Sequence, residues 1–242
     1  MGEAVSAQAR LSDDAVGSGL AWQHGMAARV AHAVVALLSG AGLASSAYLG
    51  WTVDSDLPDG VGYAGGFTAG WDHLVNQPAY FTVLSALMVC LTSVMLAVRI
   101  RWDSQLFQVV RLSGVVCVII TGVVFNLLLR GDGALTGVRL FNDTVLHLLV
   151  PVLAPLVWLI FGPHGRLRPL VVGLSMVIPL TWLAVTLGRG PFLDWYPYTI
   201  LDVPGMGYPG VWTYVVSILG VYLVLALLMW AVDRGITRWA RP

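Results

Sequence analysis

The chain has 242 residues, of which 57% are hydrophobic and only 11% are charged, and its mean hydropathy is +0.79. Soluble domains carry about 25% charged residues, so the composition excludes an ordinary soluble domain and predicts an integral membrane protein. The formal net charge is zero and every basic residue is an arginine, without any basic cluster. Nucleic acid is therefore excluded as a partner.

The first part of the chain predicts a tail, one membrane span and a loop. Residues 1–28 are small and polar, without an apolar signal region, and are expected to form a cytoplasmic N-terminal tail. The apolar run 30–49 has the length of about 20 residues that a helix needs to cross a hydrocarbon core. The segment 51–78, rich in Asp and Gly and without arginine, predicts a loop.

Five further apolar runs follow and complete an all-α, polytopic bundle of six transmembrane helices over residues 29–234, with a short tail at 235–242. These spans are expected at about 79–98, 109–129, 143–161, 170–187 and 211–232. Pro179 predicts a kink in the fifth span, because proline removes a helical hydrogen bond. The segment 188–210 predicts a long loop, in which Trp195, Tyr196 and Tyr198 suit the membrane–water boundary.

The arginines predict the orientation of the bundle. One side of the expected topology has ten of them and the opposite side has only Arg130, Arg139 and Arg189. Cytoplasmic segments are enriched in basic residues, so both termini are expected to be cytoplasmic. The use of arginine without lysine is typical of a GC-rich genome and favours the plasma membrane of a bacterium.

One acid and one histidine at the start of the fourth span form the most distinctive pattern. Asp143 and His147 are four residues apart and share one face of a helix, where the acid can hold the imidazole in one tautomer. Ionisable groups within a span are costly unless they face protein or water, which makes them functional candidates. The alternative is a histidine that simply hydrogen-bonds a neighbouring helix.

Other polar residues fall at the same, expected extracytoplasmic, end of the bundle. Thr82 begins the second span, Asn126 and Arg130 end the third, and Arg189 follows the fifth. Arginines placed against the topological rule favour an anionic or carbonyl-bearing ligand. The alternative is that they pair with interfacial acids, for which the candidates are Asp132, Asp143, Asp194 and Asp202.

This cluster contains the groups for nucleophilic catalysis. A hydroxyl becomes a nucleophile when an oriented base removes its proton, and Thr82, His147 and Asp143 would be hydroxyl, base and orienting group. Asn126, Arg130 or Arg189 would stabilise an oxyanion or hold a carboxylate. Spacing alone does not select Thr82, because three further hydroxyls are available, on Ser85, Thr121 and Thr144.

Four segments resemble a known family, the six-span membrane proteins that include the androgen-induced protein and the androgen-dependent TFPI-regulating protein of animals, with bacterial relatives. The segments are YFTVLS at 80–85, FNLLLR at 125–130, DTVLHLLVPVLAPLVWLIF at 143–161 and RGPFLDWYPYTILD at 189–202. They occur in order from the second span to the last loop.

The resemblance implies a lipid esterase. The animal members are threonine hydrolases that cleave fatty acid esters of hydroxy fatty acids, and motif position puts their catalytic threonine on Thr82 and their histidine on His147. The chain departs from the family at Ala86 and Asp143, where relatives carry amides. Candidates for substrate contact are six polar residues of the matching segments: Ser85, Asn126, Arg130, Arg189, Tyr196 and Tyr198.

Two other classes of function stay open from the sequence. The same cluster would serve a lipid-binding or small-molecule transport protein without chemistry, and it would also serve a structural protein in which it ties the span ends together. No metal site, nucleotide site or cofactor is expected. The five histidines lack metal-ligand spacing, and no Gly-rich loop joins a strand to a helix.

Overall fold

The computed structural model describes residues 25–102, 104–131 and 133–240, and most of the expected N-terminal tail lies outside the described residues. Those residues form an all-helical bundle in which six helical segments are long and apolar enough to cross a membrane: Met26–Thr52, Phe81–Val98, Gln105–Leu129, Gly137–Phe161, Pro169–Leu193 and Val203–Trp239. The predicted fold class is thus confirmed, and the protein is a multi-pass helical membrane protein.

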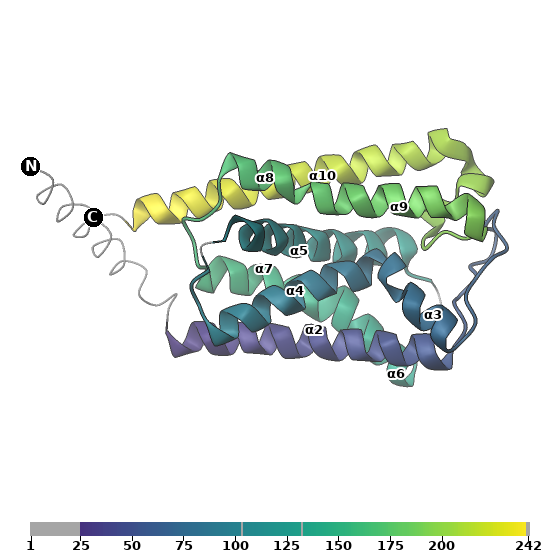
Figure 1. Ribbon diagram of the computed structural model, residues 1–242, viewed down its shortest axis with the longest axis horizontal. Coiled ribbons are helices and arrows are strands. Elements are labelled where there is room, and N and C mark those ends of the chain that lie inside the picture. Colours follow the sequence, from purple (N-terminus) through teal and green to yellow (C-terminus); the bar gives the residue numbers. More distant parts are fainter. Residues whose placement is uncertain (1–24, 103, 132, 241–242) are drawn as a thin grey trace, which may run out of the picture.

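The helices form two groups with α5 (Gln105–Val124) between them (Figure 1). One group contains α2 (Met26–Thr52), α4 (Phe81–Val98) and α7 (Val150–Phe161). The other contains α8 (Pro169–Ser175), α9 (Val177–Leu193) and α10 (Val203–Trp239). Within its most apolar stretch the α5 span is 56% buried, the largest share among the six spans, so α5 is the central helix of the bundle.

Two spans contain π-helical turns, in which one extra residue widens the helix. The α5 helix continues into η3 (Phe125–Leu129), and α6 (Gly137–Thr144) continues through η4 (Val145–Leu149) into α7. The helix of the fourth span therefore begins before Asp143, where the sequence put the start of the span. Asn142 of α6 fastens this extension to α2 by donating to the carbonyl of Gly42 at 3.1 Å.

The predicted kink at Pro179 is confirmed. The helix of the fifth span is interrupted at Met176, between α8 and α9. Pro179 has no N–H to offer to the carbonyl of Ser175 four residues earlier. The hydroxyl of Tyr222 on α10 donates to that carbonyl instead, at 2.9 Å, so the break also joins two helices of the second group.

The prediction of a long loop over residues 188–210 is wrong, because the connection is shorter. The α9 helix continues to Leu193 and α10 begins at Val203, so only residues 194–202 lie between them. The carboxylate of Asp202 caps α10 by accepting from the N–H of Gly205 at 3.0 Å, and Pro204 suits a first helical turn, where no N–H is needed. At Gly207, with φ of 69°, a kink divides α10 into a short first helix and the long helix of the sixth span.

The acidic segment 53–70 packs against the 194–202 connection and covers the end of the bundle where α4 begins. Asp202 accepts a hydrogen bond from the N–H of Gly62 at 2.7 Å, and Asp194 accepts one from Ala64 at 3.1 Å. Aromatic rings fill the space between the two segments, with Phe67 edge-on to Trp195 at 4.7 Å between centroids. The helix α3 (Trp71–Asn76) and the short turn η2 (Gln77–Ala79) then lead into α4.

Candidate active site

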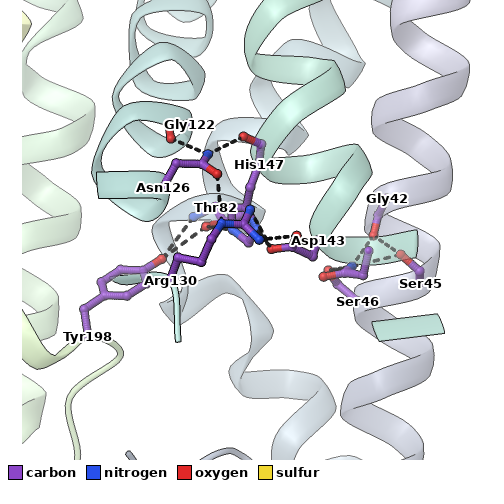
Figure 2. A network of polar contacts seen from close by, with 11 residues as sticks. Gly42, Ser45, Ser46, Thr82, Gly122, Asn126, Arg130, Asp143, His147 and Tyr198 are labelled. Atoms are coloured by element: carbon purple, nitrogen blue, oxygen red, sulfur yellow. Dashed lines mark hydrogen bonds and ion pairs between the residues drawn. The ribbon is translucent and has the colours of Figure 1, made fainter. Parts of the chain in front are cut away.

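Thr82 lies in the first turn of α4, and its hydroxyl faces one polar group from the fourth span and one from the 194–202 connection (Figure 2). Its Oγ1 is 3.4 Å from Nε2 of His147 and 3.4 Å from the hydroxyl of Tyr198. These are long hydrogen-bond distances, as is common in catalytic sites that hold no substrate. The three groups are 65 and 116 residues apart in the sequence, and only the packing of the bundle joins them.

His147 is oriented by the buried carboxylate of Asp143. The Nδ1 atom of His147 is 3.0 Å from Oδ1 of Asp143, one helical turn earlier, and Asp143 is only 5% exposed. An ionised carboxylate only accepts hydrogen bonds, so Nδ1 carries the ring proton and donates it. The lone pair of Nε2 is then directed at Thr82, which is the tautomer that a general base requires.

Arg130 and Asn126 support this carboxylate from the end of the third span. Nη1 of Arg130 donates to Oδ2 of Asp143 at 3.0 Å, and Nε of the same guanidinium donates to Oδ1 of Asn126 at 3.0 Å. The positive guanidinium balances the charge of a carboxylate that is withdrawn from water. Thr82, His147, Asp143, Arg130 and Asn126 thus form one continuous chain of contacts (Figure 2).

The backbone explains why Asn126 contacts the helix that bears His147. Residue 151, four positions after His147, is a proline and has no N–H for the His147 carbonyl. Nδ2 of Asn126 donates to that carbonyl at 2.9 Å. The two helices come close because residue 122 is glycine: a Cβ atom there would lie 2.6 Å from Cβ of Pro151. Both π-helical turns lie at this crossing and carry site residues, as such turns frequently do.

Phe125 is a site residue that the sequence analysis did not single out. Its ring is parallel to the imidazole of His147, with 3.5 Å between centroids, and the guanidinium of Arg130 lies 5.2 Å from the same phenyl ring. The phenyl ring therefore limits the rotation of the base and covers one of its faces. Phe125 directly precedes Asn126 in FNLLLR, and this adjacency was the one signal that pointed to it.

An apolar cavity of about 90 Å³ begins at Thr82. Its walls come from α4, α5, α9, the 194–202 connection and α10, and they are almost entirely aliphatic or aromatic. The lining residues include Thr82, Phe125, Trp182, Leu183, Tyr198 and Ile218. Pockets that enclose a whole drug-sized ligand start at roughly 300 Å³, so this cavity fits a segment of a hydrocarbon chain next to the Thr82 hydroxyl.

Tyr198 closes the polar end of this cavity. Its hydroxyl accepts a hydrogen bond from the backbone N–H of Thr82 at 3.2 Å. Burial raises the pKa of the Tyr198 phenol above its ordinary value, so the group is a neutral hydroxyl at physiological pH. Its proton is available for donation to an oxygen placed beside Thr82.

Three residues that the sequence predicted to contact the substrate make other contacts in the structure. Arg189 donates to Oδ1 of Asn76 at 2.5 Å and is joined to α3 and not to the His147 network. Tyr196 is buried with its ring 5.8 Å from that of Tyr63 and outside the cavity wall. Ser85 is fully buried and its hydroxyl donates to the Thr82 carbonyl at 3.0 Å. This bond leaves Thr82 as the hydroxyl that faces the imidazole.

No group of three or more His, Cys, Asp or Glu side chains in the described part of the chain is arranged to hold a metal ion. Comparisons of the chain with protein families, with curated proteins and with solved structures found no match. The class defined by the fold is a six-span membrane protein, and its candidate site is a half-buried Thr–His–Asp arrangement beside an apolar cavity.

Proposed function

We propose that the protein is a membrane-embedded hydrolase that cleaves lipid esters, with Thr82 as nucleophile, His147 as general base and Asp143 as the group that orients His147. The observation that carries this proposal is the continuous contact from Thr82 Oγ1 through both nitrogens of His147 to Asp143, beside an apolar cavity. Hydroxyl, base and orienting carboxylate are the three roles that nucleophilic ester hydrolysis requires.

In the first half-reaction Thr82 Oγ1 attacks the ester carbonyl carbon while Nε2 of His147 takes the hydroxyl proton. The tetrahedral intermediate has an oxyanion, and Tyr198 is the neutral donor beside it. The position of Thr82 in the first turn of α4 further favours negative charge, because the helix dipole is positive there. The intermediate then expels the alcohol oxygen, which receives the proton from His147, and leaves an acyl group on Thr82.

In the second half-reaction a water molecule gives one proton to Nε2 of His147 and its oxygen attacks the acyl carbon. Collapse of the second intermediate breaks the bond to Thr82 Oγ1, and His147 returns the proton to that oxygen. The products are a carboxylic acid and the free threonine. Asp143 keeps the Nδ1 proton in place throughout and balances the imidazolium that forms in each half-reaction.

The substrate class follows from the walls of the cavity. An aliphatic and aromatic lining fits a hydrocarbon chain and offers no hydrogen-bond partner to a polar one, and the reactive hydroxyl lies beside it. An ester of a fatty acid with a hydroxy fatty acid, as the family resemblance implies, would put its acyl chain in the cavity and its carbonyl at Thr82.

We propose further that this site faces the extracytoplasmic side of a bacterial plasma membrane, with both termini in the cytoplasm. The support is the distribution of arginines in the sequence: ten of the thirteen belong to the tails, linkers and span ends expected on one side, against three on the side of Thr82. Reagents that modify introduced cysteines and do not cross membranes, applied to intact cells, would test this orientation.

The hydrolase proposal is tested by covalent labelling with a fluorophosphonate that carries an alkyl chain. The purified protein in a mild detergent is expected to be labelled, and peptide mass spectrometry is expected to find the adduct on Thr82. Both Thr82→Val and His147→Gln should lose the label. The matched control is Thr92→Val, the same substitution on the same helix, because the Thr92 hydroxyl donates to its own helix at Met88.

Folding of each variant is checked by thermal unfolding. A folded wild-type protein that takes no label, and that hydrolyses no fluorogenic long-chain ester, would contradict the hydrolase proposal. In that case the same cavity and polar cluster would be assigned to binding or transport of a lipid without chemistry.

A further inference from the structure

A second cavity lies at the end of the bundle away from Thr82. It has a volume of about 270 Å³ and is formed by the segment between α7 and α8 together with the last turns of α10. Figure 1 shows these elements at the left, while α3 and α6 mark the opposite end. The cavity shares no lining residue with the one at Thr82, so it is a separate feature of the molecule.

The distinctive feature of this cavity is its arginines. Arg168, Arg234 and Arg238 line it from two different elements. Within the described part of the chain none of the three side chains makes an ion pair, and Arg234 only lies over the ring of Trp230 at 5.1 Å. All three arginines are exposed around one cavity, and their like charges favour an anion there.

The one acid in the cavity wall is already satisfied by other donors. Asp233 is 1% exposed, and its two carboxylate oxygens accept from the N–H of Gly165 at 2.9 Å and of Leu167 at 3.1 Å. It is also 3.3 Å from Nδ1 of His164. Even with Asp233 ionised, three positive charges against one negative charge leave a formal excess of two.

Trp230 contributes an aromatic ring to the same wall, and the guanidinium of Arg234 lies over that ring. Its Nε1 atom is buried, is not exposed to the cavity and has no hydrogen-bond acceptor in the described part of the chain. The groups that can attract a ligand to this cavity are therefore the arginines.

We infer that this cavity binds the phosphate group of an anionic membrane phospholipid. The charge excess and the donors match a phosphate that has no compensating ammonium group. The adjoining surface is suited to the lipid tails: Leu170 of α8 and Leu228 of α10 are 60% and 55% exposed at this end of two membrane-spanning segments. A free phosphate ion would use the guanidinium groups and leave this apolar surface unused.

Lipid binding is measured by native mass spectrometry and by thermal unfolding of the full-length protein in a neutral detergent. The probes are dioleoyl phosphatidylglycerol, dioleoyl phosphatidylcholine and inorganic phosphate alone. Phosphatidylglycerol is expected to bind and to raise the unfolding temperature more than phosphatidylcholine. The variants Arg234→Gln and Arg238→Gln should each weaken its binding about fivefold.

The matched control is Arg101→Gln, an exposed arginine that does not line the cavity, and it should bind phosphatidylglycerol like the wild type. Thr82→Val should also keep the binding, which separates this inference from the proposed hydrolase. Equal binding of phosphatidylglycerol by the wild type, Arg234→Gln and Arg238→Gln would overturn the inference. Protection by inorganic phosphate as large as that by phosphatidylglycerol would overturn it in favour of a site for a free anion.

Discussion

The side-chain amide of Asn126 donates to the backbone carbonyl of His147 at 2.9 Å, a carbonyl to which Pro151 has no N–H to donate. The proline thus creates an acceptor in the middle of a membrane span, and a residue of a neighbouring helix satisfies it. The same amide group accepts from Arg130 through its oxygen. One side chain thereby couples the backbone of the base to the guanidinium that holds Asp143.

Replacement of Asn126 by leucine should destabilise the protein and also reduce its activity. The variant Asn126→Leu keeps the approximate volume but leaves the His147 carbonyl without this donor, which should cost about 1–2 kcal/mol. Thermal unfolding in detergent checks this. Ser217→Ala is the control, since the Ser217 hydroxyl only bonds its own helix at Thr213, and it should change stability by less than about 0.5 kcal/mol. Equal unfolding temperatures for the two variants would contradict the argument.

Variants of the Arg130–Asp143 pair should distinguish the effect of Asp143 on stability from its effect on catalysis. In Asp143→Asn the guanidinium of Arg130 loses its charge partner, and the imidazole faces an amide that can donate as well as accept and so no longer selects one tautomer. Turnover should fall about 10²–10⁴-fold. The double variant Asp143→Asn with Arg130→Gln should regain about 1 kcal/mol of stability relative to Asp143→Asn, because no unpaired charge remains. Its turnover should stay low, and recovery of turnover in the double variant would show that Asp143 acts only as a partner of Arg130.

Removal of the Tyr198 hydroxyl should affect the rate more than substrate binding. Tyr198→Phe keeps the ring in place against Trp182, whose centroid is 6.3 Å away, but removes the donor beside Thr82. An oxyanion donor of this kind contributes about 10²-fold to kcat, while KM should change little. Steady-state kinetics on a fluorogenic ester check this, and an unchanged kcat would exclude Tyr198 from the reaction.

The pH dependence of hydrolysis tests the role of Tyr198 in a second way. Burial raises the pKa of its phenol, so the hydroxyl proton remains bound through and above the ordinary tyrosine pKa of about 10. Below about pH 10, the rate of hydrolysis by the wild type should therefore depend on pH in the same way as the rate of Tyr198→Phe. A loss of activity near pH 8 or 9 in the wild type alone would show that the phenol ionises more easily than its burial indicates.

The contact between Gly122 and Pro151 should leave no room for a side chain at position 122. In Gly122→Ala the new Cβ would meet Pro151 at 2.6 Å, so the helices must separate, which should cost about 1–3 kcal/mol and lengthen the contact between Asn126 and His147. Gly173→Ala is the matched control, because no atom lies within 4 Å of its added Cβ. There the helix should gain about 0.5–1 kcal/mol. Thermal unfolding of both variants checks the contrast, and destabilisation of Gly173→Ala as well would contradict it.

The features that the sequence determined by itself depend on composition and on helical periodicity. Six apolar runs of sufficient length predicted six spans, and Pro179 predicted the break in the fifth. The contacts of Asp143 with His147 and of Asn126 with Arg130 also follow from local spacing. Each pair is four residues apart, and side chains at that spacing are neighbours on one helical face.

The tertiary structure alone decided how these two pairs are joined and what lies beside them. Thr82 and Tyr198 reach His147 because α4, the α9–α10 connection and η4 converge, while Arg189, expected at the same end, turns to Asn76. The rotation of each helix about its axis is set by packing, by the Gly122–Pro151 contact and by two π-helical turns. Helical periodicity in the sequence does not reveal these features. A π-helical turn has one extra residue, and that residue redirects every side chain that follows it.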